Sequence, residues 1–384
     1  MTKIVFLYST VNIGDEANAN SIFNELSKKS SIKERFDIDV NEDFSLIATQ
    51  YLALNHKDIV FAVGEKAMSF LSYLHKNGLI DKRESIVAAT IHQYDDGIKK
   101  IPLDYLALPA VVLDNEEKRK VVANINSFTL TFSVPTNNPS TDILKQSYDN
   151  WNIDNKPSLE NEYIIIMLPG DAPDSKNNIR YFTKQSAELL FEDIKKLWLK
   201  NSSKHKIIIH NGPRTGRYDS ESGEISCNHE SEEMDQVSQY FLSLFERSNI
   251  EYQFFNFYFK IENGTKTPVS VFNQLLYLSE GENKDNYFIV PGESVSMLGQ
   301  IPLYLESNKV IVFKSSSMNE AHELVFNSAV EHNYVSYFDD NSEVVKPNNS
   351  KKRENDDVSE IVDDFITDLD LKGVCKEDLL SKDF

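Results

Sequence analysis

The segment Tyr287–Phe313, YFIVPGESVSMLGQIPLYLESNKVIVF, constrains the fold more than any other part of the chain. Tyr287–Val290 is an apolar run typical of a buried strand, and the Pro-Gly pair that follows predicts a turn. Ser294 and Ser296 then stand where a helix begins, and a second apolar run follows that helix. This order predicts a β-α-β unit of a parallel sheet, with both serines beyond the carboxyl end of the first strand.

The start of this predicted helix could bind an anion. The first backbone N–H groups of a helix lack intrahelical partners and carry a partial positive charge. A phosphate above Ser294–Ser296 would accept hydrogen bonds from these N–H groups and from both hydroxyls. Glu293 directly precedes the two serines, and we count it among the predicted donor-binding residues. The alternative is that one serine simply caps the helix.

Apolar runs alternate with helical patterns along both halves of the chain, which predicts mostly parallel sheets covered on both sides. In the second half we expect a strand over Tyr252–Phe259 and a helix over Pro268–Glu280. The length of 384 residues suits two domains. We therefore predict an α/β protein with two Rossmann-like domains that face a cleft. The predicted parts are an N-terminal domain (1–151), a polar linker (152–161), a second domain (162–338), and an acidic loop with a C-terminal helix (339–384).

The end of the chain carries an apolar stripe at helical spacing. Its members are Val358, Ile361, Val362, Phe365, Ile366 and Leu369. The stripe predicts an amphipathic helix that docks its apolar face. Binding of a protein partner is an alternative use of the same face.

The acidic composition excludes several classes of partner. A formal net charge of −20 argues against nucleic acid or an anionic membrane, since both require clustered Lys and Arg. The two cysteines, Cys227 and Cys375, do not suffice for a disulfide framework or a cysteine zinc site. No apolar run is long enough to span a bilayer, and no signal peptide is evident. We expect a cytoplasmic protein, or an effector delivered into another cell.

Three segments in the right order resemble one known family. GESVSMLGQIPLYLESNKVIVF at Gly292–Phe313, NIGDEANAN at Asn12–Asn20 and HNGPRTG at His210–Gly216 are similar to landmarks of the family named after the plant mitochondrial-fission protein ELM1. Bacterial members of that family look like GT-B glycosyltransferases. The resemblance implies a GT-B-like fold, a nucleotide-sugar donor in the second domain, and a C-terminal helix that returns to the first domain. It also implies a ribose-binding role for Gln300, although the family has an acidic residue there. Pro302 is a second departure from the family pattern.

The first predicted strand ends in a polar loop that could bind the acceptor. This loop and the next turn contain Asn12, Gly14 and Asn18, and Gly14 would let the backbone approach a ligand. The Asp15 carboxylate could accept a proton from an attacking hydroxyl, or it could merely cap the helix. His92, at the end of a later predicted strand, is an alternative general base.

Two loops of the second half add candidates for binding a diphosphate. Gly170 follows a strand and permits close backbone approach. Arg214 and Thr215 follow the next strand, and a guanidinium stays charged and can bind phosphate through two parallel hydrogen bonds. Alternatively, Arg214 is a surface residue paired with Glu221 or Glu224.

Absent motifs narrow the choice of function. The chain has no P-loop motif, no GxGxxG after a strand and no GxSxG, and its His residues are too scattered to propose a metal site. We predict metal-independent transfer of a sugar from a nucleotide-sugar to an unknown acceptor, with no further cofactor. The alternatives are a GT-B-like binding or effector protein without turnover, and a GT-B-like transferase of a pyruvyl-type group.

Overall fold

The computed structural model describes residues 2–371 except 11–12, 42, 55–57, 81–84, 93, 95, 135, 137, 174–177, 202, 263–264, 281–284 and 355. The contacts divide the chain into two compact units. The first unit comprises Met1–Asn138 and Asn355–Phe384, and the second comprises Pro139–Glu354. The last segment of the chain therefore belongs to the unit with which the chain begins.

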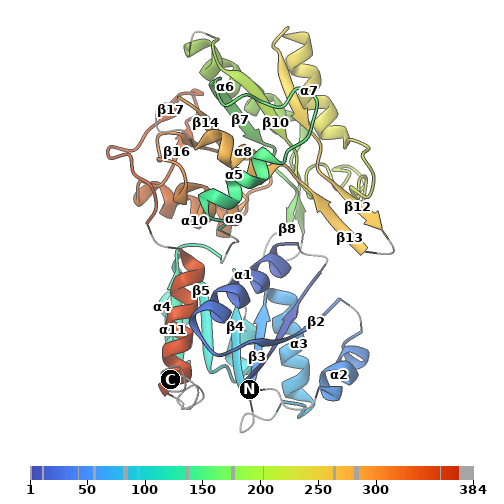
Figure 1. The fold of residues 1–384 in the computed structure, drawn as a ribbon, viewed down its shortest axis with the longest axis vertical. Coiled ribbons are helices and arrows are strands. Elements are labelled where there is room, and N and C mark those ends of the chain that lie inside the picture. The colour runs from blue at the N-terminus through green and yellow to red at the C-terminus, as the bar shows by residue number, and fades with distance from the viewer. Residues whose placement is uncertain are drawn as a thin grey trace. The chain divides into compact units, whose positions relative to one another are not determined.

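The first unit is built on a six-stranded parallel sheet with the order β2-β1-β3-β4-β5-β6 (Figure 1). Its inner strands read as continuous apolar runs because helices cover both faces, whereas the edge strands β2 and β6 contain polar, partly exposed residues. Ile59–Val63, for example, is buried at every position. The strands are β1 (Lys3–Tyr8), β2 (Glu34–Asp39), β3 (Ile59–Val63), β4 (Ile86–Thr90), β5 (Tyr105–Pro109) and β6 (Ser127–Thr131).

Two apolar clusters lie on the two faces of this sheet. One joins the strands to α2, α3, α4 and the short 3-10 turns, and the other joins them to α1 and α11. The bounds are α1 (Ile13–Lys29), α2 (Phe44–Ala53), α3 (Glu65–Lys76), η1 (Asp96–Lys100), η2 (Ala110–Val112), α4 (Glu116–Ala123) and α11 (Asp357–Leu371).

The C-terminal helix α11 is part of the core of the first unit. Its apolar stripe is buried, and Phe365 packs edge-on against the ring of Phe61. A buried hydrogen bond also joins the helix to the sheet, since the hydroxyl of Tyr105 in β5 donates to the carbonyl of Ile361 over 3.0 Å. The predicted amphipathic helix is thus confirmed, and the face that we considered for a protein partner is buried within this unit.

The second unit contains a seven-stranded sheet with the order β11-β10-β7-β14-β15-β16-β17. All neighbouring strands are parallel except the edge pair β16 and β17. Two small hairpins, β8–β9 and β12–β13, stand apart from it (Figure 1). The strands are β7 (Tyr163–Met167), β8 (Ala172–Pro173), β9 (Ile179–Arg180), β10 (Lys206–His210), β11 (Tyr252–Phe255), β12 (Tyr258–Glu262), β13 (Thr265–Val269), β14 (Tyr287–Pro291), β15 (Val310–Phe313), β16 (Ser336–Phe338) and β17 (Val344–Val345).

Helices α6 and α7 cover one face of this sheet through a cluster of buried apolar side chains. Helix α8 contacts β7 and packs on α5, which precedes the segment predicted as the linker. The bounds are α5 (Thr141–Asp149), α6 (Lys184–Lys200), α7 (Gln236–Arg247), α8 (Phe272–Ser279), α9 (Val295–Gln300), η3 (Ile301–Leu303) and α10 (Glu320–Glu331). The prediction of two Rossmann-like α/β units is confirmed.

Two local predictions in the second unit are wrong. The aromatic run Tyr252–Phe259 does not form one strand, since β11 ends at Phe255 and β12 begins at Tyr258. Between them, the backbone N–H of Phe257 donates to the Asn211 side chain over 2.6 Å instead of to a neighbouring strand. Helix α8 starts at Phe272 and not at Pro268, which instead pairs with Phe259 in the β12–β13 hairpin. None of the described helices combines the length and apolar character needed to cross a bilayer.

We expect replacement of the α11 anchor Phe365 by Ala to destabilise the first unit by about 3–5 kcal/mol, because the ring is fully buried. Denaturant unfolding measures this change. Asp363→Ala on the exposed side of the same helix breaks only the surface ion pair with Lys29, and should cost less than about 1 kcal/mol. Equal losses for the two variants would contradict the docking of α11.

Candidate functional site

Each of the two parallel sheets reverses its strand order at one place. In the first unit, β1 lies between β2 and β3, so the chain moves to one side of β1 and then to the other. In the second unit the same reversal occurs at β7, which lies between β10 and β14. In open α/β sheets, ligands bind beyond the carboxyl ends of the strands at such switch points. Most of the predicted site residues follow the strands on either side of these two points.

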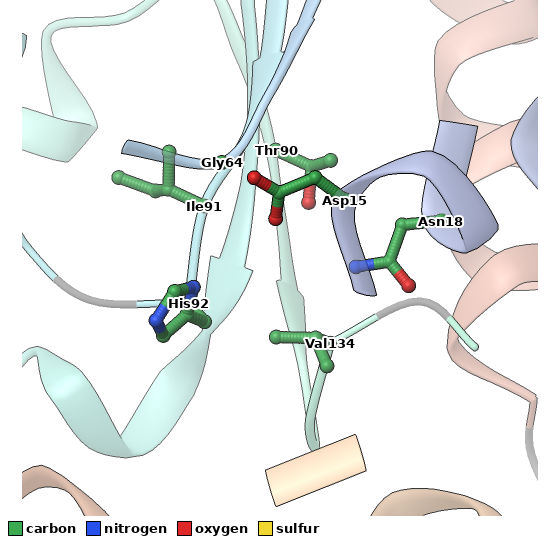
Figure 2. Close-up of a pocket in the computed structure, with 7 residues that line it drawn as sticks. All are labelled: Asp15, Asn18, Gly64, Thr90, Ile91, His92 and Val134. Carbon is green, nitrogen blue, oxygen red and sulfur yellow. The ribbon is translucent and has the colours of Figure 1, made fainter. Parts of the chain in front are cut away.

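In the first unit, Asp15 and Gly64 meet at the switch point. Asp15 lies in the first turn of α1 and is 5% exposed, and Gly64 follows β3 with φ +85°. A Cβ atom on Gly64 would lie only 2.4 Å from Oδ2 of Asp15. Glycine is thus required here both for the backbone conformation and for space, because the Asp15 carboxylate fills the position of a side chain (Figure 2).

His92 follows β4 and contacts a carboxylate that the sequence did not point to. Its Nδ1 lies 2.9 Å from Oε1 of Glu65, the first residue of α3. Burial raises the pKa of Glu65, but the charge and hydrogen bonding of His92 and the backbone outweigh burial, and the pKa lies below its usual value. Nothing in the sequence joins Glu65 to a residue 27 positions later.

Asp15, Asn18 and His92 line one small recess, which Figure 2 shows. Its other lining residues are Gly64, Thr90, Ile91 and Val134. The recess has room for about one water molecule, so it suits a single hydroxyl group and not a whole sugar. Gly14 is exposed in the first turn of α1, and Asn12 lies outside the described residues.

In the second unit, the carboxylate of Glu293 joins three loops at the switch point. The N–H of Gly170, after β7, donates to Oε1 over 2.6 Å, and the hydroxyl of Ser315, after β15, donates to Oε2 over 2.8 Å. Glu293 itself follows β14 and is 2% exposed, and this burial raises its pKa. Glu293 and Gly170 therefore shape the site by bonding to each other. A direct contact of either with a phosphate stays a prediction.

Arg214 lies on a turn that packs closely against the Gly170 loop. A Cβ atom on Gly170 would lie 2.8 Å from Cβ of Arg214, and the N–H of Asp171 donates to the carbonyl of Arg214 over 2.9 Å. The Arg214 side chain is exposed and makes no ion pair within the described part of the chain, with Glu221 and Glu224 included. Its positive charge still acts on the buried carboxyl groups of Glu293 and Asp171, where it opposes the rise in pKa that burial causes.

Buried polar groups under this turn fix its shape. Thr215 is fully buried, and its Oγ1 accepts a hydrogen bond from the N–H of Gly212 over 3.0 Å. The same hydroxyl donates to the carbonyl of Leu168 over 3.5 Å, and this second bond would have to break for the hydroxyl to donate to a phosphate. Gly216 has φ +58°, and a Cβ atom there would lie 2.3 Å from Oδ1 of Asp235. Asp235 caps α7 and also accepts a hydrogen bond from Asn211 over 3.1 Å.

Ser294 and Ser296 are available for a ligand, whereas Gln300 is not placed with them. Ser294 occupies the N-cap of α9 without a side-chain capping bond, so the capping alternative does not describe it. Its hydroxyl lies 3.5 Å from that of Ser296, which is exposed. Gln300 ends the same helix, roughly 9 Å further along its axis, and is 9% exposed. Pro302 lies in the 3-10 turn that replaces the helix there.

Ser315 and Ser317 belong to the same edge and were missed. Their hydroxyls lie 2.8 Å apart, and Ser317 is fully buried. The sequence contained a signal for them. Three serines follow the apolar run Val310–Phe313, just as Ser294 and Ser296 follow the apolar run Tyr287–Val290.

The comparisons with known proteins support no family assignment. No family model matches the chain, and no curated protein matches it. Among solved structures, MurG from Acinetobacter baumannii is 8% identical with a TM-score of 0.44, covering 98% of this chain and 94% of that one. UDP-GlcNAc 2-epimerase from Neisseria meningitidis bound to UDP-GlcNAc is 12% identical with a TM-score of 0.35, covering 98% and 93%.

A UDP-forming alpha,alpha-trehalose-phosphate synthase from Burkholderia vietnamiensis is 8% identical with a TM-score of 0.40, covering 99% of this chain and 95% of that one. All three TM-scores are below 0.5, so these likenesses carry no argument about the function of the chain. The resemblance to the ELM1 family stays a prediction.

Gly64→Ala should destabilise the protein by about 1–3 kcal/mol more than Gly78→Ala, as measured by denaturant unfolding. Both glycines have positive φ, but a Cβ atom on Gly78 meets no atom within 4 Å, whereas one on Gly64 collides with the Asp15 carboxylate. Gly78→Ala thus measures the cost of a β-carbon at positive φ without a collision, while the φ of +85° and ψ of 169° at Gly64 add backbone strain of their own. Equal destabilisation would mean that Asp15 does not occupy the space beside Gly64.

Proposed function

We propose that the protein is a GT-B-like glycosyltransferase that binds a nucleotide-sugar donor on its second unit and an acceptor hydroxyl on its first. The observation that carries this proposal is the exposed Arg214, which has no ion-pair partner among the described residues and lies beside the switch point of the second sheet. An exposed guanidinium with no carboxylate at ion-pair distance among the described residues, in a protein with a net charge of −20, fits the binding of an anion.

Arg214 and the two serines have the chemistry to bind a diphosphate. The guanidinium stays charged at any accessible pH and offers parallel N–H donors, while Ser294 and Ser296 offer hydroxyl donors. When the sugar leaves, negative charge grows on the diphosphate, and donors already fixed in position stabilise that charge. These groups are held in position by their surroundings, namely Gly170, Glu293 and the turn around Thr215. We propose that this transfer needs no metal.

The recess of the first unit would bind and activate the acceptor. The Glu65 carboxylate beside Nδ1 of His92 favours the tautomer in which Nδ1 carries the proton and Nε2 carries the lone pair. We propose that Nε2 removes the proton from the acceptor hydroxyl, and that Asp15 and Asn18 orient that hydroxyl. The Glu65 carboxylate would also stabilise the positive charge that the imidazole gains when it takes this proton.

A second candidate is a binding protein without turnover. The observation in its favour is the burial of Gln300, at the position for which the resemblance implies ribose binding. Such a protein would bind the nucleotide at the same edge but would neither transfer nor hydrolyse the sugar.

Arg214→Ala should weaken binding of a nucleoside diphosphate by about 10- to 100-fold, because charge-assisted hydrogen bonds are lost. Titration calorimetry with UDP, GDP, ADP, CDP and TDP measures the affinity, with and without a chelator. Arg247→Ala removes the same charge at the far end of α7 and should leave affinity unchanged. Unchanged affinity in Arg214→Ala would remove this residue from the donor site, and loss of binding in chelator would contradict metal independence.

His92→Gln should slow sugar transfer by about 10²- to 10⁴-fold while leaving donor affinity unchanged, because a general base is lost and the donor site lies on the other unit. Release of free nucleotide from the donor that binds in the titration measures the rate. His75→Gln, at the exposed end of α3, serves as the matched control. A wild-type protein that binds donor but releases no nucleotide favours the binding protein without turnover.

A further inference from the structure

An exposed serine and a buried histidine are hydrogen-bonded near the carboxyl ends of the strands of the second unit. Ser270 lies two residues before the start of α8 and is exposed, while His210 ends β10 and is 1% exposed. Their atoms Oγ and Nε2 lie 3.0 Å apart. Neither residue is among the donor-site groups described above. His210 pairs with Met167 of β7 and with Phe255 of β11, and its imidazole bonds to the carbonyl of Phe255 and to Ser270.

The surroundings of His210 determine which way this hydrogen bond runs. Its Nδ1 lies 2.8 Å from the carbonyl oxygen of Phe255, which can only accept, so Nδ1 carries the proton. Nε2 then has the lone pair, and the hydroxyl of Ser270 must donate to it. Burial lowers the pKa of His210 to about 4, so the imidazole stays neutral and keeps this lone pair throughout the neutral range.

The oxygen of Ser270 is also stabilised from the other side. The backbone N–H of Phe272, the first residue of α8, donates to Oγ over 3.2 Å. A hydrogen bond to Oγ and the nearby helix start both favour negative charge on that oxygen as its proton leaves. An accessible hydroxyl, a base held in one tautomer by a carbonyl, and a donor to the oxygen are the parts of an activated serine nucleophile.

We propose that Ser270 is a nucleophile, activated by His210, that accepts an acyl group from an activated ester. Oγ forms a bond to the acyl carbon while its proton passes to Nε2. The bond from that carbon to the leaving oxygen then breaks, and the leaving alcohol takes the proton from Nε2. The products are an ester on Ser270 and a free alcohol, with no oxidant or reductant consumed.

The basicity of His210 sets the kind of ester that can react. A buried imidazole with a pKa far below 7 is a weak base, so only esters with good leaving groups should acylate Ser270. The same weakness makes His210 a poor activator of water for the return step. We therefore expect the acyl group to accumulate on the serine instead of turning over.

The test is incubation of the full chain with p-nitrophenyl acetate. Release of p-nitrophenol is followed in time, and peptide mass spectrometry then locates the acetyl group. We expect a burst of about one equivalent that is lost in Ser270→Ala and retained in Ser220→Ala, an exposed serine that bonds to no histidine among the described residues. Above about pH 5 the burst rate should not follow a histidine titration, because His210 is already neutral.

His210→Gln separates activation by the histidine from simple exposure of the serine. We expect acetylation of Ser270 to slow by at least about tenfold in this variant, and thermal melting checks that the variant is folded. If His210→Gln does not fold, the comparison of the wild type with Ser270→Ala and Ser220→Ala still tests the proposal. Absence of a burst, acetylation at another residue, or equal rates in folded His210→Gln and wild type would overturn the proposal.

Discussion

The candidate donor site depends on one buried carboxylate. Glu293 accepts hydrogen bonds from the loops that follow two other strands, so three chain segments share one anchor. A buried carboxylate is stable only if its oxygens are bonded, and here Gly170 and Ser315 supply those bonds. The Glu293 side chain, which we predicted to bind the donor, instead holds these loops together, and Arg214, Ser294 and Ser296 remain accessible to a ligand.

Close packing of glycine against polar side chains recurs at both switch points. Gly64 leaves room for the Asp15 carboxylate, and Gly170 leaves room for the turn that carries Arg214. In both places a side chain at the glycine position would displace a functional group and not merely fill empty space. In both units, therefore, a glycine at the end of a strand leaves space for a group from a neighbouring loop.

The fold followed largely from local sequence patterns, whereas the partners of the site residues did not. Tyr287–Val290 could be predicted as a strand because continuous apolar runs are typical of parallel sheets with both faces covered. The pairing of Glu65 with His92 joins separate elements, and no local pattern encodes it. The end of strand β11 at Phe255 depends on Asn211, which follows the neighbouring strand β10, so the aromatic run alone could not reveal it.

Amide hydrogen exchange of the full chain, with and without a mixture of UDP-, GDP-, ADP-, CDP- and TDP-sugars, tests the central claim most directly. The account predicts slower exchange in the loops that follow β7, β10 and β14 of the second unit when donor is present. Slower exchange confined to the first unit, or no change in any of these loops, would contradict a donor site at Arg214.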